Sequence, residues 1–550
     1  MSAVAPSAVA PPPAELRETT FVKRPQRSLR PSRAAIEPLA LFGCAFAAYL
    51  VLGWQITLER HAIPEDGISR LAHAFFVFYN APHKLAAIGF VWPPLETMVF
   101  LPLAAIKPLA TSLWALPLTT AVFGAALLVA LAGWLREAGM PTWRRLALVV
   151  LLGINPMIAC YASNGMGEVI SLWLLTTSIV AYVRWHQERN VRQLIIAGVS
   201  LAIGSLVRYE IALWALVLVP AIVFREPRRR GFRVEAEASA ITLLAPVVYA
   251  LGLWSFLNWT IIGHPLSWLR SESTVTFAET SGAAGHITIL DSLREAASVH
   301  LRLFPLTFVV AAALVLVAVR RRSSVGAILA AALLLNAAAT AALALKTQAP
   351  NVFQLRYNMR AIPLVLVGVG WLYTQIKSSR SRLAVWSATA VALAATLPLT
   401  WHTMATDPNQ FREGPFTRAL ATGRDQQGTR VVGSNDRIAV TQDEAMAHYV
   451  VHHVRGRNRI LADDAKSFGI MLRSGNPSLF VDRVDLGDAD WFRVAAAPYG
   501  RVDYVLFSDQ RDDLLNRLYP RAYGGRERGL RLVYSTSTSR LYAIVGELRG

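Results

Sequence analysis

The chain has 550 residues, of which 54% are hydrophobic and 17% are charged, whereas a soluble domain carries about 25% charged residues. Apolar runs of about 20 residues, the length that a bilayer-spanning helix needs, recur from Ala35 to Trp401 between short charged joints. These features exclude a purely soluble enzyme and a disordered or fibrous chain, and they predict an α-helical polytopic membrane protein.

The N-terminal region, 1–34, is rich in Ala, Pro, Ser and basic residues, which predicts a disordered cytoplasmic tail. A transmembrane domain with about eleven spanning helices is expected over 35–402. An additional apolar stretch at 93–106 contains three prolines and is too short to span, so we expect an interfacial or re-entrant segment. The expected spans are 35–56, 111–135, 145–163, 166–183, 193–208, 210–224, 236–262, 302–319, 324–345, 360–376 and 383–402.

The charge distribution indicates an orientation in the membrane. The net charge of +19, from 55 basic and 36 acidic residues, would by itself point to nucleic acid or an anionic surface. However, 23 of the basic residues fall in the tail and in alternate short joints, the pattern of a cytoplasmic face. We therefore expect a multi-pass protein of the plasma (inner) membrane with a cytoplasmic N-terminus, an extracytoplasmic C-terminal domain and no nucleic-acid partner.

Residues 403–550 have the composition of a soluble domain. Short β-branched runs near 430–432, 459–461, 479–484, 502–507, 530–534 and 540–545 alternate with helical patterns at 442–454, 464–473 and 511–518. This alternation predicts a small α/β domain. No glycine-rich nucleotide-binding signature is present in it.

Three outer loops, 57–110, 263–301 and 346–359, are where functional residues are expected. In the first, Glu65 and Asp66 follow a proline at the start of a predicted helix, and Arg70 shares a face with Asp66. Acidic residues are favoured at a helix start by the helix dipole. The functional interpretation is a carboxylate that acts as a general base at the membrane edge.

Further elements allow a structural and a functional interpretation. Trp92-Pro-Pro-Leu95 is either a turn that ends the preceding helix or a rigid wall of a substrate site. Arg208 and Glu210, at a span junction, form either an interfacial ion pair or a charged site facing a cavity.

The loop before the tenth span contains Arg356, Tyr357 and Arg360. The two arginines either snorkel to the interface or bind a phosphate, to which a planar guanidinium is suited. Glu168 is interpreted as a helix start. No metal-ligand set is found and no cofactor is identified, although a divalent cation remains open.

Taken together, Glu65-Asp66 with Arg70, Trp92-Pro-Pro-Leu95, Arg208-Tyr-Glu210 and Arg356-Tyr357 with Arg360 resemble the GT-C superfamily of integral-membrane glycosyltransferases, of the protein O-mannosyltransferase and aminoarabinose transferase type. Those relatives often carry Asp-Glu and Lys-Pro-Pro-Leu, so the order Glu65-Asp66 leaves the base ambiguous, and Trp92 replaces a lysine.

The resemblance implies inverting transfer of a sugar from a polyprenyl-phosphate donor to a glycan, lipid or protein acceptor on the outer face. In that reaction Asp66, or else Glu65, is the base. Arg70, Arg356 and Arg360 hold the leaving phosphate, and Arg208 and Glu210 orient the sugar or the base. Membrane lipids are the other expected partners, and the sugar is not specified.

Two other functions compete with this interpretation. A multi-span transporter or flippase of a lipid-linked or small anionic substrate predicts repeats and midplane charges, whereas the unusual charges here lie at span edges. A non-catalytic anchor for the C-terminal domain does not need eleven spans.

Overall fold

The computed structural model describes residues 33–90, 92–223, 232–270, 286–426, 440–509 and 513–548. The predicted tail over residues 1–32, the predicted strand at 430–432 and part of the loop 263–301 lie outside these residues.

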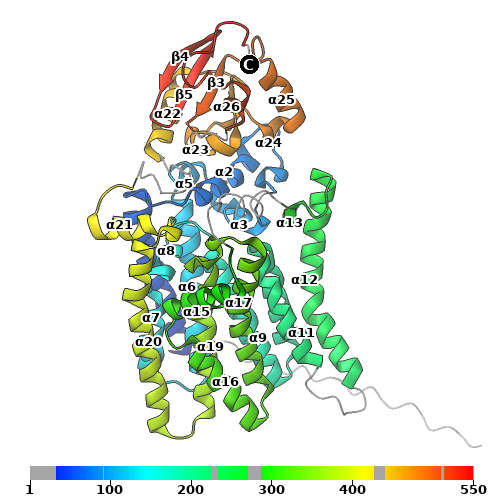
Figure 1. The fold of residues 1–550 in the computed structure, drawn as a ribbon, viewed down its shortest axis with the longest axis vertical. Coiled ribbons are helices and arrows are strands. Elements are labelled where there is room, and N and C mark those ends of the chain that lie inside the picture. The colour runs from blue at the N-terminus through cyan, green and yellow to red at the C-terminus, as the bar shows by residue number, and fades with distance from the viewer. Residues whose placement is uncertain are drawn as a thin grey trace, which may run out of the picture.

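A bundle of long helices forms the larger part of the molecule (Figure 1). Most of these helices are apolar on several faces, as expected for helices in contact with lipid and with one another. The bundle comprises α1 (Arg33–Leu52) with its π-helical extension η1 (Gly53–Leu58), α6 (Ala115–Glu137), α7 (Thr142–Gly153), α8 (Pro156–Tyr161), α9 (Glu168–Glu188), α10 (Val191–Val207), η3 (Tyr209–Trp214), α11 (Ala215–Val223), α12 (Phe232–Ile262), α15 (Ile289–Leu303), α16 (Thr307–Arg321), α17 (Ser324–Thr347), α19 (Ala361–Gln375) and α20 (Ser379–Thr406).

Every predicted span coincides with helical structure, although three are broken. The span expected at 145–163 is divided into α7 and α8, that at 210–224 into η3 and α11, and α16 follows α15 after a bend of 96°. Among the described residues, five helices are long and apolar enough to cross a bilayer, or six if the bent pair is one span. The helical character of the predicted spans is thus observed, and the count of eleven crossings stays a prediction.

Ion pairs join the helices at the joints that the sequence assigned to the cytoplasmic face. Arg145 on α7 pairs with Glu37 on α1, and Arg184 on α9 contacts Glu137 on α6 at 2.7 Å. These basic residues therefore also fasten neighbouring helices together.

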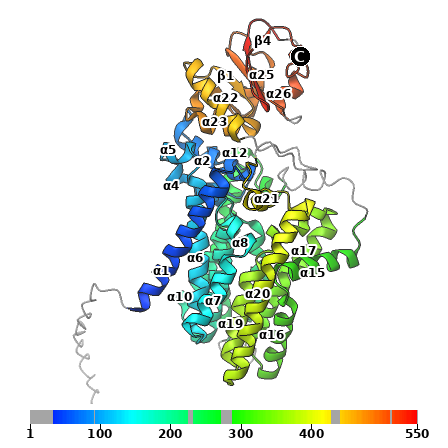
Figure 2. The ribbon, with the colours of Figure 1, turned by 90° about the vertical axis from the view of Figure 1, so that its left-hand side faces the viewer.

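The first outer loop folds into short helices between the bundle and the C-terminal sheet (Figures 1 and 2). The expected helix after Pro64 is α2 (Glu65–Tyr79), and the apolar stretch at 93–106 is broken by its prolines into short helices. The remaining short elements are η2 (Leu85–Ile88), α3 (Pro94–Met98), α4 (Leu101–Ala104), α5 (Lys107–Thr111), α13 (Ser267–Arg270), η4 (Pro350–Phe353) and α18 (Leu355–Asn358).

The C-terminal region contains a five-stranded mixed sheet in the order β2-β1-β3-β5-β4. Strands β2, β1 and β3 are parallel, and β5 is antiparallel to β3 and β4. The predicted strands in the described residues are all present, whereas α24 and α25 were not predicted. The elements are η5 (Pro408–Gln410), α21 (Gly414–Thr422), α22 (Val440–His453), β1 (Ile460–Ala462), α23 (Asp464–Ser474), η6 (Pro477–Leu479), β2 (Phe480–Val481), α24 (Arg483–Leu486), α25 (Asp488–Ala496), β3 (Tyr504–Ser508), α26 (Leu514–Leu518), β4 (Leu530–Ser535) and β5 (Ser539–Ile544).

One buried apolar cluster joins this region to the outer loop. It combines Phe75 and Phe76 of α2 with Met471 of α23 and Ile460 of β1. Because α20 continues to Thr406, the boundary expected at 403 falls inside a bundle helix.

Candidate functional site

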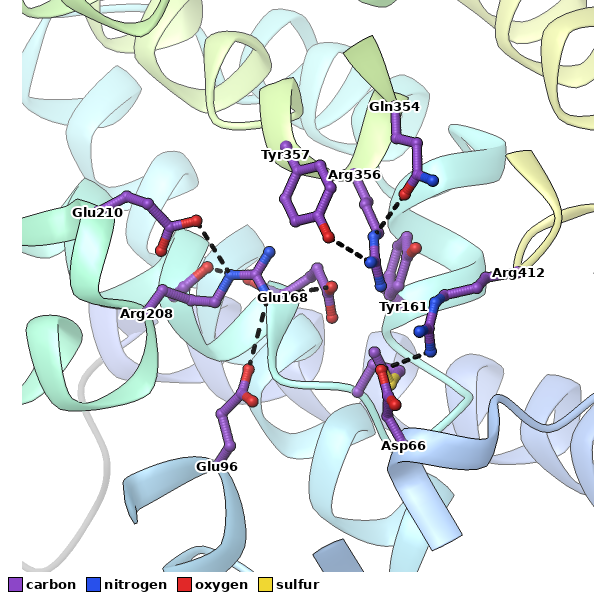
Figure 3. A network of polar contacts seen from close by, with 12 residues as sticks. Asp66, Glu96, Tyr161, Glu168, Arg208, Glu210, Gln354, Arg356, Tyr357 and Arg412 are labelled. Carbon is purple, nitrogen blue, oxygen red and sulfur yellow. Dashed lines mark hydrogen bonds and ion pairs between the residues drawn. The ribbon is translucent and has the colours of Figure 1, made fainter. Parts of the chain in front are cut away.

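Charged side chains from six distant parts of the chain converge where the bundle meets the outer-loop helices (Figure 3). They come from the start of α2, from α3, from the start of α9, from the junction of α10 with η3, from α18, and from the segment that follows α20. The labelled members are Asp66, Glu96, Tyr161, Glu168, Arg208, Glu210, Gln354, Arg356, Tyr357 and Arg412.

Asp66 lies in the first turn of α2, where Pro64 ends the preceding extended segment. Its Oδ2 is 2.5 Å from Nη1 of Arg412, and the two side chains are 14% and 15% exposed. Burial opposes ionisation of Asp66, but the charge of Arg412, followed by those of Arg70 and Arg356, outweighs it and holds the pKa below its usual value.

Glu96 lies at the centre of the network, on α3. Its Oε2 is 2.6 Å from Nη2 of Arg70, and both side chains are almost fully buried. The guanidinium of Arg70 also stacks over Trp92, with its Cζ 5.1 Å from the ring centroid. Burial raises the pKa of Glu96 to about 7 in spite of the adjacent arginine. This carboxyl group can therefore gain or lose a proton near neutral pH.

Arg208 follows the end of α10 and faces three carboxylates. Its Nη1 lies 3.7 Å from Glu168 and 3.8 Å from Glu96, and its Nε lies 4.0 Å from Glu210. These separations are too long for direct hydrogen bonds. Glu210 makes its closest ion pair, 3.3 Å, with Nη2 of Arg360.

Arg356 on α18 is held by its neighbours in sequence. Its Nε donates to Oε1 of Gln354 at 2.9 Å, and its Nη2 donates to the hydroxyl of Tyr357. The Tyr357 ring stacks with Arg356 and also lies 5.3 Å from Cζ of Arg208. One aromatic ring thus places two guanidinium groups beside each other.

Several buried atoms of the site have no hydrogen-bond partner among the described residues. They include the donors Nη2 of Arg208 and Nε2 of Gln354, and the acceptors Oε1 of Glu96 and both carboxylate oxygens of Glu168. Buried polar groups are normally hydrogen-bonded, so this arrangement fits a ligand that carries an anionic group and hydroxyl groups together. In the described part of the chain, no three His, Cys, Asp or Glu side chains are grouped to hold a metal ion.

The structure brings the predicted site residues together, with two differences in their contacts. Arg70 and Arg360, expected to hold a phosphate, are each paired with a carboxylate. Glu65, the first residue of α2, is partly exposed beside Asp66. The structure gives no test of the roles assigned to these residues, which stay predictions.

Sequence reasoning assigned Glu168 only to a helix start and missed five members of the network, namely Glu96, Tyr161, Gln354, Arg412 and Glu413. Glu96 carried a usable signal, because it is the one charged residue in the apolar stretch 93–106. Arg412 and Glu413 carried none, since their partners Asp66 and Tyr161 lie hundreds of residues away. Gln354 had no distinguishing pattern.

No family model and no curated protein matches this sequence. The fold, however, is similar to crystal structures of ArnT from Cupriavidus metallidurans. The apo form has a TM-score of 0.57 at 12% identity over 93% of this chain and 98% of the other. The form bound to undecaprenyl phosphate has a TM-score of 0.54 at 12% identity, over 92% and 98%.

This chain has an ArnT-like fold. The resemblance found in the sequence motifs is thereby confirmed at the level of the fold. The similarity extends over both parts of the molecule, because the matches cover nearly the whole of each chain.

Proposed function

We propose that the protein is an inverting glycosyltransferase that moves a sugar from a polyprenyl-phosphate donor to a hydroxyl of a glycan, lipid or protein acceptor. The observation that carries this proposal is the largely buried carboxylate of Asp66 in one network with arginine and amide donors that have no acceptor among the described residues. Support also comes from the ArnT structure with undecaprenyl phosphate, which shares the fold.

In the proposed reaction the acceptor oxygen attacks the anomeric carbon from the face opposite the phosphate. A carbon–oxygen bond forms to the acceptor, the bond to the phosphate oxygen breaks, and its electron pair leaves with the polyprenyl phosphate. Asp66 takes the proton of the acceptor hydroxyl. A base needs to be ionised before the reaction, and the lowered pKa of Asp66 meets that requirement.

The phosphate is best matched by Arg208, Arg356 and Gln354. Arg208 and Gln354 have buried donors left over, and Arg356 lies beside them on the Tyr357 ring. Preorganised donors of this kind stabilise the negative charge that develops on a leaving phosphate. Arg70, stacked on Trp92, then acts by fixing Glu96. Arg360 acts by fixing Glu210.

The sugar is best matched by Glu96 and Glu168. Oε1 of each carboxylate faces Arg208 from a different helix, at a distance too long for a hydrogen bond, and has no hydrogen-bond donor among the described residues. Hydroxyl hydrogens of a sugar ring would satisfy these acceptors, as buried acceptors require. A sugar that lacks those hydroxyl groups should bind more weakly.

We place the site on the outer face of the membrane. The ion-paired basic joints and the C-terminal sheet lie at opposite ends of the bundle, and the site lies at the sheet end (Figure 1). A lipid-linked donor can reach that end by lateral diffusion, whereas a cytosolic sugar nucleotide cannot. Clustering of the charges at this end also disfavours the transporter alternative, which predicts charges near the midplane.

The test uses the full-length protein in nanodiscs and two readouts. Undecaprenyl phosphate binding is measured first, and we expect R356Q to weaken it about tenfold or more while D66N leaves it unchanged. Transfer from a panel of undecaprenyl-phosphate monosaccharides is measured second, and D66N should abolish it. The E65Q variant tests the adjacent acid and should still transfer sugar if Asp66 is the base. Transfer by D66N at the wild-type rate would overturn the assignment of the base.

A further inference from the structure

The segment that follows the last bundle helix, Asp407–Gln426, runs over the site, and we call it the strap. At its start, Gln410 accepts a hydrogen bond from the backbone N–H of Leu355 at 3.1 Å. At its end, the backbone N–H of Gln426 donates to the carbonyl of Arg60 at 2.9 Å. The strap therefore joins the α18 region to the segment that leads into Asp66.

Two neighbouring residues of the strap reach into the site from its middle. Glu413 accepts a hydrogen bond from the hydroxyl of Tyr161 and is 1% exposed. Arg412 extends toward α2 and contacts Asp66 at 2.5 Å. A second contact, 3.0 Å between His61 and Asp425, ties the strap to the residues just before Asp66. The position of Arg412 is thus fixed on both sides by the fold.

The contact between Arg412 and Asp66 engages one end of each group. Nη1 of Arg412 bonds to Oδ2 of Asp66, while Nε of Arg412 is buried without a hydrogen-bond partner among the described residues. No hydrogen bond to Oδ1 of Asp66 is found in the part of the chain that the structure describes. One carboxylate oxygen is anchored, and the other is left to accept a proton.

We propose that Arg412 is a positioning residue for the base, which anchors one oxygen of Asp66 so that the other faces the acceptor hydroxyl. The proposal rests on the function proposed above. It adds a role for a residue that lies beyond the last bundle helix, in a region that the sequence assigned to the C-terminal domain.

The other charges that face Asp66 come from four elements. Arg70 lies on α2, Arg356 on α18 and Arg208 at the end of α10, and Glu96 of α3 opposes them. Arg412 has the largest electrostatic effect on Asp66 among the cations. Its removal should therefore leave Asp66 easier to protonate even though the other three arginines remain.

The experiment compares R412Q and R412K with R418Q in the full-length protein. Arg418 lies on the same strap, where its Nε donates to Gln426 at 3.1 Å, so R418Q tests the strap without removing the contact to Asp66. The first readout is the pH profile of kcat/KM for the acceptor. Loss of an opposite charge at this distance shifts a carboxyl pKa by about one unit or more. The acid limb of the profile should therefore shift to higher pH by about one unit or more in R412Q, so the variant loses activity toward about pH 5 sooner than wild type does. R412K should restore part of this, and R418Q should follow wild type.

The second readout does not depend on sugar transfer. A hydrophobic carbodiimide modifies protonated carboxyl groups, and peptide mass spectrometry reports the modification of Asp66 separately from that of Glu65. Modification of Asp66 in R412Q should be about tenfold faster than in R418Q at about pH 5. Equal modification rates, or an equal loss of activity at every pH, would overturn the role of Arg412. Faster modification without any sugar transfer by wild type would instead contradict the proposed function alone.

Discussion

Replacing Arg70 with methionine removes the cation that lies 2.6 Å from Glu96, in a pair whose side chains are 2% and 1% exposed. Methionine keeps much of the volume and leaves the carboxylate with Arg208 at 3.8 Å. Removing one partner of a buried pair costs about 3–5 kcal/mol, because the remaining charge is buried without compensation. We therefore expect R70M to lower the free energy of unfolding by about this amount at about pH 8.

The cost should depend on pH, because Glu96 can respond by taking up a proton. Its pKa is raised to about 7 by burial, so in the wild type it is mostly ionised at about pH 8 and mostly protonated at about pH 6. R70M raises this pKa further and keeps the group protonated at both values. Because the unfolded glutamate is ionised at both pH values, the wild type loses about 1.4 kcal/mol of stability between about pH 6 and about pH 8, and a variant that stays protonated loses about 1.4 kcal/mol more. R70M should cost that much less at about pH 6.

A surface pair provides the control. Arg459 and Asp503 are 3.0 Å apart, and their side chains are 48% and 51% exposed. R459M should cost at most about 1 kcal/mol. Unfolding of the purified protein in detergent, followed by intrinsic fluorescence at the two pH values, measures all three proteins. Equal losses for R70M and R459M, or a loss for R70M that is larger at the lower pH, would refute the reasoning.

Two further results are expected. In α10, a Cβ on Gly198 would lie 2.7 Å from the carbonyl oxygen of Leu243, so G198A should lower the thermal midpoint of unfolding. A Cβ on the helical Gly133 would meet nothing within 4 Å, so G133A should raise the free energy of unfolding by about 0.5–1 kcal/mol. Undecaprenyl phosphate should bind more weakly as the pH rises above about 7, because an ionised Glu96 repels the added anion. Titration by native mass spectrometry measures the affinity at each pH, and E96Q should remove its pH dependence.

Much of the fold could be predicted because each span carries its own signal. The length and apolarity of a run such as 115–137 depend on the bilayer rather than on any neighbour. The helix after Pro64 was predictable for a similar local reason. The angles at the breaks in the bundle were harder to predict. Pro305 marks the break between α15 and α16, but the bend of 96° depends on how both helices pack.

The candidate site was predictable only where a charge stood out from its local surroundings. Arg208 and Arg356 lie at span edges, where a charged residue is costly unless it faces a polar site. The pairing of Asp66 with Arg412 bridges 346 positions and leaves no trace in the composition of either segment. The boundary expected at 403 separated these residues further, since it assigned Arg412 to another domain.

The balance of positive and negative charges in the site bears on how it would recognise a phosphate. From the sequence, the arginines outside the basic joints suggested a cationic site. The structure instead gives each of them an acidic partner or neighbour, and two of those acids, Glu96 and Glu413, have pKa values raised by burial. When all groups are ionised the arginine charges are largely compensated, so a phosphate is not attracted by net charge alone. It is matched by donors that lack acceptors, and proton uptake by the acids with raised pKa values can offset its charge. Binding of an anion and protonation of Glu96 are therefore thermodynamically linked.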